Sequence, residues 1–80
     1  MKNKIKNLVE ETRLIDYLPH GSITQIAQKL DKERGTVRGA LQGKWVNVEI
    51  VDTSIDIIES EILRLTKFID DFKVRYEKLK

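Results

Sequence analysis

The hydrophobic residues of the chain recur at helical spacing from end to end, and no stretch alternates in the two-residue period of a strand. The pattern therefore predicts an all-α protein. One apolar stripe predicts a first helix over about residues 4–18, ended by Pro19 because proline disfavours helical geometry at the residue before it. The residues of that stripe are Ile5, Leu8, Val9, Ile15 and Leu18.

A short second helix is predicted to begin after Ser22 and to end near Leu30. Ser22 and Gln25 have the spacing of a capping box, in which each side chain satisfies a free backbone N–H of the other. Asp31 and Lys32 would then form a tight turn, since aspartate tolerates a left-handed backbone better than most residues.

The third helix is predicted over about residues 33–42, with Val37, Ala40 and Leu41 on its buried side. Gly43 follows it at the position where a left-handed C-terminal cap is favoured. Two further glycines, Gly35 and Gly39, lie inside this helix. They would let the backbone approach DNA closely, they would mean weak base readout, or they would form a surface that docks on another protein.

The strongest periodic signal begins near residue 47, where apolar residues follow one another in steps of four and three. This seven-residue repeat is typical of a coiled-coil seam. We predict a fourth helix of about 30 residues, about 45 Å long, and two units, a headpiece of residues 1–46 and an oligomerisation helix of residues 47–80. The seam comprises Val51, Ile55, Ile58, Ile62, Leu65, Ile69, Phe72, Tyr76 and Leu79.

A helix of that length would leave an exposed apolar line that residues 1–46 could not cover, and soluble monomers avoid such patches. We therefore expect a homodimer. Isoleucine at Ile55, Ile62 and Ile69 favours a parallel pair, while a tetramer, an antiparallel arrangement, and a helix packed on its own domain remain alternatives.

The charge of the chain is unevenly distributed. Residues 1–45 contain nine Lys/Arg and five Asp/Glu, a net charge of +4, whereas residues 46–80 contain six and eight, a net charge of −2. A basic half joined to an acidic half suggests that the first half faces a polyanion. Ordinary surface charge would give the same numbers.

The segment 23–41 has the arrangement of a DNA-binding helix-turn-helix. Ala27 is small, as required where the second short helix crosses the first. The spacing that defines the motif is carried by Ile26, Ala27, Leu30, Val37 and Leu41.

With its flanks included, the sequence SITQIAQKLDKERGTVRGALQGK (residues 22–44) resembles the N-terminal DNA-binding segment of the lac-repressor family of bacterial regulators. The resemblance implies that the helix after the turn lies in the major groove of double-stranded DNA. The chain departs from the family at the turn, where Asp31-Lys32 replaces glycine and an aliphatic residue. We expect neither the family's sensor domain nor its hinge helix, and therefore no small-molecule effector.

The family's base-contacting positions map onto Arg34 and Gly35. Arg38 lies four residues after Arg34 and therefore on the same helix face, and arginine matches the O6 and N7 acceptors of guanine. We predict base contacts by Arg34, Gly35 and Arg38. The predicted phosphate contacts are Ser22, Lys32, Thr36 and Lys44.

Other residue types exclude several chemistries. The chain has no Cys and a single His, His20, and it contains neither a glycine-rich phosphate loop nor a Ser/His/Asp set. We therefore expect no enzyme, metal or cofactor. No apolar run approaches the roughly 20 residues of a membrane span, and we expect a cytoplasmic protein. Tyr17 and Trp45 are expected in the core, with a DNA-backbone contact as the alternative for Trp45.

Taken together, these patterns predict a sequence-specific transcription regulator, most simply a repressor of bacterial or phage origin. Two alternatives remain open. One is a helix-turn-helix fold that docks on a protein rather than reading DNA sequence. The other is a DNA-packaging protein that is indifferent to sequence.

Overall fold

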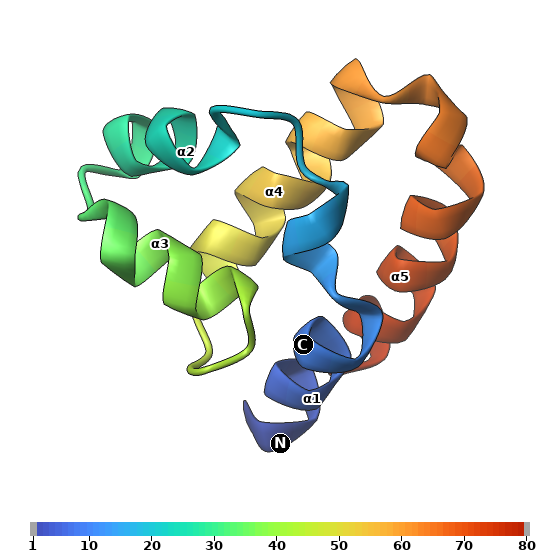
Figure 1. Ribbon diagram of the computed structural model, residues 1–80. Coiled ribbons are helices and arrows are strands. Elements are labelled where there is room, and N and C mark those ends of the chain that lie inside the picture. Colours follow the sequence, from blue (N-terminus) through green and yellow to red (C-terminus); the bar gives the residue numbers. More distant parts are fainter. Residues whose placement is uncertain (1, 80) are drawn as a thin grey trace.

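The computed structural model describes residues 2–79, and these residues form helices with no strand (Figure 1). The prediction of an all-α protein is confirmed. The elements in chain order are α1 (Lys2–Thr12), η1 (Leu14–Tyr17), α2 (Ser22–Leu30), α3 (Arg34–Leu41), α4 (Val48–Glu61), η2 (Leu63–Leu65) and α5 (Thr66–Leu79), where η denotes a 3-10 helix.

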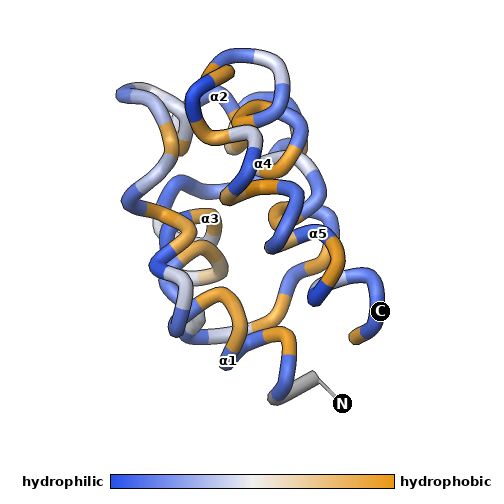
Figure 2. Tube along the Cα trace, turned by 90° about the vertical axis from the view of Figure 1, so that its right-hand side faces the viewer, coloured by the Kyte–Doolittle hydropathy of each residue, from blue (hydrophilic) through white to orange (hydrophobic). Residues whose placement is uncertain are grey.

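Helix α4 lies at the centre of the molecule, with α2 and α3 on one side and α5 on the other (Figure 1). It begins where the Asn47 side chain accepts a hydrogen bond from the Ile50 backbone N–H at 3.1 Å, which satisfies a free donor of the first turn. Its buried hydrophobic residues belong to the core that α4 shares with these neighbours, and Figure 2 marks its hydrophobic stretches in orange along the trace. The buried residues of α4 are Ile50, Val51, Thr53, Ser54, Ile55, Ile57 and Ile58.

A single hydrophobic core joins all five α-helices. Leu8 of α1, Ile26 of α2, Val37 of α3 and Phe72 of α5 all belong to it. The two predicted units, residues 1–46 and 47–80, therefore share one core instead of forming a headpiece and a separate oligomerisation helix. This sharing matters because a chain of 80 residues has little apolar surface with which to build two cores.

The predicted continuous helix over residues 47–80 is wrong. Helix α4 ends at Glu61, Ile62 adopts extended backbone angles (φ −127°, ψ 79°), and after η2 the chain turns back so that α5 packs against α4 and α1. The greatest extent of the Cα trace is 29 Å, well short of the roughly 45 Å that the continuous helix would need.

The predicted seam forms part of the protein's own core. Ile62, Leu65 and Leu79 are half-buried, and the other six seam residues are buried: Val51, Ile55, Ile58, Ile69, Phe72 and Tyr76. A seven-residue repeat marks one apolar face of a helix but not the helix that covers it. Here the second half of the repeat folds back on the first and on α1, so the seam makes no coiled coil within the described chain.

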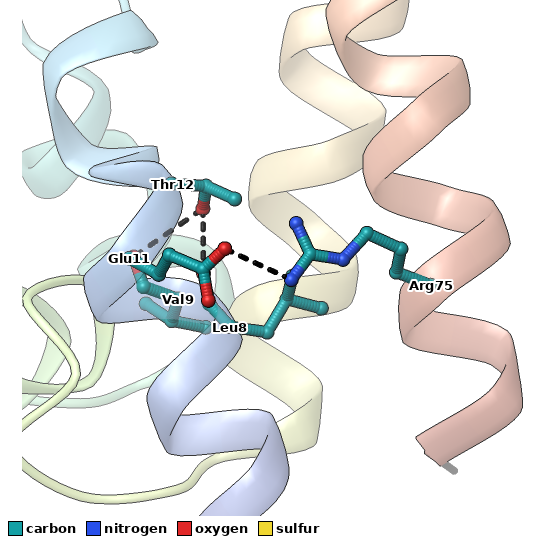
Figure 3. Close-up of polar contacts among 5 residues, drawn as sticks. All are labelled: Leu8, Val9, Glu11, Thr12 and Arg75. Carbon is teal, nitrogen blue, oxygen red and sulfur yellow. Dashed lines mark hydrogen bonds and ion pairs between the residues drawn. The ribbon is translucent and has the colours of Figure 1, made fainter.

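Two ion pairs at the surface join α5 to its neighbours α1 and α4. Arg75 Nη2 donates to Glu11 Oε1 at 3.1 Å across the α1–α5 contact, as Figure 3 shows. Lys73 Nζ lies 2.8 Å from Glu59 Oε2, and this hydrogen bond and charge raise the pKa of Lys73. Both ion pairs are solvent-exposed, so each contributes little stability by itself.

Tyr76 makes a part-buried polar contact between α5 and α4. Its hydroxyl donates to Asp52 Oδ1 at 2.9 Å, with the Val48 carbonyl 3.4 Å away. Burial raises the pKa of Tyr76, and the hydrogen bond to Asp52 raises it further. Figure 3 also shows Thr12, whose hydroxyl donates to the Leu8 carbonyl at 2.7 Å close to the end of α1.

The first helix is shorter than predicted. It ends at Thr12, because Arg13 adopts a left-handed conformation (φ 55°) and the chain continues as the 3-10 helix η1. Pro19 therefore does not end it. The turn at Arg13 places Leu14 in the core. Tyr17, which was expected in the core, is 36% exposed, and its ring stacks on Phe68 of α5 with 3.9 Å between ring centroids.

Candidate nucleic-acid interface

Helices α2 and α3 are joined by a turn of three residues, 31–33. Asp31 caps α2 in a left-handed conformation (φ 54°, ψ 52°) and donates its N–H to the Gln28 carbonyl at 3.4 Å. The Lys32 N–H reaches the Ala27 carbonyl at 2.9 Å. These two bonds close the end of α2 in the manner of a Schellman motif. The prediction of a tight turn with left-handed Asp31 is confirmed.

The start of α2 differs from the prediction. Gly21 is its N-cap, and no side chain caps the helix. Ser22 is the first helical residue, it is buried, and its hydroxyl donates to the Pro19 carbonyl at 2.7 Å. The predicted capping box of Ser22 and Gln25 is therefore wrong. The buried, engaged hydroxyl of Ser22 is also unsuited to the phosphate contact that the sequence suggested.

Helix α3 has one face in the core and one face in solvent. Val37, Ala40 and Leu41 are buried, as predicted, and they pack in the core that also holds Ile26 and Ala27 of α2. The opposite face presents the exposed residues Arg34, Gly35 and Arg38. The three predicted base-contacting positions therefore lie together on the outer surface of α3.

The arginine side chains of this face make no ion pair or hydrogen bond with any described residue. Both line a groove of about 710 Å³, whose opposite wall is formed by residues 18–24, including His20 and Thr24. Sequence reasoning did not connect His20 and Thr24 with the site. His20 lies in the loop after η1 and Thr24 in the first turn of α2, and no local sequence signal predicts that they line one groove with the arginines of α3.

The two glycines of α3 occupy different surroundings. A Cβ at Gly35 would meet nothing, so this position leaves the backbone open to solvent. A Cβ at Gly39 would collide with the Trp45 indole, which lies over it. Gly39 is therefore buried by the protein itself, and of the two glycines only Gly35 offers bare backbone to a ligand.

Trp45 packs on the outside of α3, over Gly39. Its indole N–H donates to the Thr36 carbonyl at 3.2 Å, while the side chain remains partly in solvent, so that the residue is 46% exposed. The expectation of a core position for Trp45 was wrong. A glycine in a helix interior signals either flexibility or close approach, and the sequence alone did not show which residue approaches Gly39.

Gly43 caps α3 as predicted, in a left-handed conformation (φ 80°). The N–H groups of Gly43 and Lys44 reach the carbonyls of Ala40 and Gly39 at 3.3 and 2.9 Å. A Cβ at Gly43 would also press on Glu10 and on the Lys6 carbonyl of α1. The glycine thus permits both the turn and the contact between α1 and the end of α3.

The predicted phosphate-contacting residues differ in accessibility. Lys44 is exposed, while Lys32 and Thr36 are half-buried and remain at the surface. The segment 29–44 contains five cations and two acids, a net charge of +3, and none of these side chains forms an ion pair with a described residue. The ion pairs of the described chain lie instead on α1, η1, α4 and α5.

Comparison of the chain with models of protein families, with curated proteins and with solved structures finds no match. Among the described residues, no helix combines the length and the apolar character needed to cross a membrane.

Proposed function

We propose that this protein is a sequence-specific, double-stranded-DNA-binding regulator whose helix-turn-helix motif is formed by α2, the turn at residues 31–33, and α3. One observation carries the proposal. The outer face of α3 presents Arg34 and Arg38, whose side chains form no ion pair or hydrogen bond with a described residue, while the inner face of the same helix is held in the core. A rigid helix with two free guanidinium groups on its outer face is suited to the major groove.

Each part of this surface has a role in the proposed complex. Arg34 and Arg38 would donate to guanine O6 and N7, and the bare backbone at Gly35 would permit a close approach to a base edge or a thymine methyl. Lys32 and Lys44 would contact phosphates, which orient the protein without reading sequence. The groove between α3 and residues 18–24 has room for the DNA backbone beside the bases that are read.

One copy of the chain presents one such helix and would read one half-site. A repressor of this type binds a near-palindrome when two copies hold their recognition helices about 34 Å apart. Because the predicted seam is occupied by the core of its own chain, pairing on DNA would need a different contact from the coiled coil expected from the sequence.

The test is a selection from a random pool of duplex DNA, followed by affinity measurements on the enriched site. Arg34→Ala and Arg38→Ala should each lose about 1–3 kcal/mol of binding free energy and relax the choice of base at one position. Arg64→Ala is the matched control, since it removes the same charge from an exposed residue of η2 that forms no ion pair with a described residue.

Salt dependence separates base readers from phosphate contacts. Lys44→Ala should weaken binding to all sequences about equally and reduce the slope of log K against log salt by about 1. Equal affinity for every duplex, with no enriched motif, would replace the proposal with sequence-indifferent DNA binding. Unchanged affinity in both arginine variants would refute α3 as the recognition helix.

A protein-docking role is the second candidate, and the surface around Trp45 favours it. Trp45 and Val48 are both exposed large hydrophobic residues, and they flank the start of α4. Tryptophan is enriched at the energetic centres of protein interfaces. Absence of DNA binding at low salt, together with loss of a protein contact in Trp45→Ala, would support this function instead.

A further inference from the structure

The turn between α4 and α5 has no sequence element that forces a helix to stop. The residues around it, ESEILRLTKF (59–68), contain neither proline nor glycine. Sharp bends in helices usually have such a cause, and most of these residue types, Glu, Leu, Arg and Lys in particular, favour helix. The bend is therefore imposed by packing elsewhere in the molecule.

Few contacts within the turn itself hold it bent. The Leu65 N–H donates to the Ile62 carbonyl at 3.0 Å, and the Thr66 hydroxyl donates to the Leu63 carbonyl at 2.7 Å. Leu63 packs on almost nothing and is 79% exposed, the largest value among the exposed large hydrophobic residues of the described chain. The attachment of α5 comes mainly from Ile69, Phe72 and Tyr76 in the core.

The apolar repeat keeps its phase through the turn. The steps of three and four continue from Ile58 through Ile62 and Leu65 to Ile69, as they would on one unbroken helix. Residues 48–79 as a single helix would be about 48 Å long. In that form α5 would extend away from its own α1, and its apolar face would lose every contact in its own chain.

We propose that two copies of this chain exchange α5. In each copy α4 and α5 straighten into one helix, and α5 packs against α1 and α4 of the other copy. The contacts of α5 with α1 and α4 are then remade between chains, including the hydrogen bond of Tyr76 to Asp52 and the ion pair of Arg75 to Glu11. This proposal does not depend on DNA binding.

The exchange removes the two unfavourable features of the bent form. The interrupted helix regains continuous hydrogen bonding through the turn. Leu63, exposed in the bent form, lies where the two straightened helices pass each other at a two-fold axis, and an isologous contact there would bury it. Exchange of identical elements is a low-cost route to a dimer because the contacts already exist.

The first test uses sedimentation over a range of concentrations up to about 1 mM, after refolding at high concentration, because dimer formation follows mass action. Leu63→Pro is compatible with the bent form for two reasons. Proline is tolerated at the first position of a helical segment, and it favours extended backbone angles at the residue before it, which Ile62 already adopts. The variant should lower the dimer association constant at least about 100-fold, since proline disrupts a continuous helix. Leu63→Ala is the control for loss of the side chain alone and should still dimerise.

Thr66→Ala gives the opposite change and keeps the test informative should Leu63→Pro fail to fold. It removes the hydrogen bond to the Leu63 carbonyl and places the best helix former in the turn. We expect it to raise the dimer association constant about tenfold. A wild-type protein and a Thr66→Ala variant that both remain monomeric would overturn the proposal.

Crosslinking identifies which copy supplies α5. The chain has no cysteine, so Glu11→Cys and Arg75→Cys can be placed on two chains with different tags, refolded together and treated with a short bismaleimide. Exchange predicts a covalent link between the two tags in the dimer fraction. The control is a single chain that carries both cysteines. If this chain links to itself while the dimer of the two tagged chains gives no link, the dimer uses another surface and the exchange is overturned.

Discussion

The turn between α2 and α3 and the turn between α4 and α5 each join two helices, but different forces shape them. Asp31 ends α2 with a left-handed residue and two capping hydrogen bonds, and Gly43 ends α3 in the same way. Both helix ends depend on residues next to them in the sequence, and both were predicted from the turn-forming residues Asp31 and Gly43. The turn at Ile62 has no such residue.

The difference shows what an apolar repeat can and cannot specify. The nine apolar residues that make up the repeat between residues 51 and 79 are all buried or half-buried. The repeat therefore correctly marks which side chains are covered. It does not say whether the cover comes from another chain or from the same chain bent back. At a capped turn, such as that at Asp31, nearby residues decide where the helix ends. At an uncapped turn, such as that at Ile62, the packing of the whole molecule decides it.

The largest expected effect would come from weakening the packing that holds the second turn bent. Phe72 is buried between α5 and the rest of the core, while Val74, two residues later, is 57% exposed. Phe72→Ala should lower the free energy of unfolding by about 3–5 kcal/mol. Val74→Ala should change it by less than about 0.5 kcal/mol. Urea unfolding followed by circular dichroism measures both, and equal effects would show that α5 is not packed as described.

The two glycines of α3 provide a matched pair in the locally specified region. Gly39→Ala should displace the Trp45 indole and lower stability by about 1 kcal/mol, because overpacking outweighs the gain in helix propensity. Gly35→Ala has open space and should raise stability by about 0.5–1 kcal/mol. Urea titrations give the stabilities, and fluorescence of the single tryptophan reports displacement of the indole.

The same pair separates stability from binding. If Gly35 approaches DNA, Gly35→Ala should be more stable than the wild type and yet bind the selected site more weakly. A variant that gains stability without losing affinity would limit base readout to Arg34 and Arg38.

The last prediction concerns the pH dependence of stability and Tyr76. Because the folded protein raises the pKa of Tyr76, the unfolded chain loses this proton at lower pH than the folded protein does. Above about pH 10 the unfolded state therefore binds fewer protons, and stability falls as pH rises. Tyr76→Phe should lose about 1 kcal/mol at neutral pH but show a shallower decline above pH 10. A decline as steep as that of the wild type would assign the alkaline loss to other groups.

The shared position of three candidate residues on α3 was predicted correctly, whereas their contacts with DNA stay a prediction. Arg34, Gly35 and Arg38 share the outer face of α3, because residue spacing on a short helix decides which side chains lie together. Ser22 was misplaced because the capping box ignores the competing Pro19 carbonyl. Trp45 and Gly39 were not connected because their contact depends on the path of the chain after Gly43.

From the sequence alone followed the helical class, the turn at Asp31, the cap at Gly43 and the buried side of α3, all of which depend on residues close together along the chain. Only the tertiary structure decided that α4 and α5 form two helices, that α5 covers α1, and that one core serves the whole chain. The physical reason is that burial of apolar surface is non-directional: the stripe of residues 51–79 gains about as much from its own chain as from another, and only the arrangement of all the helices together selects between them.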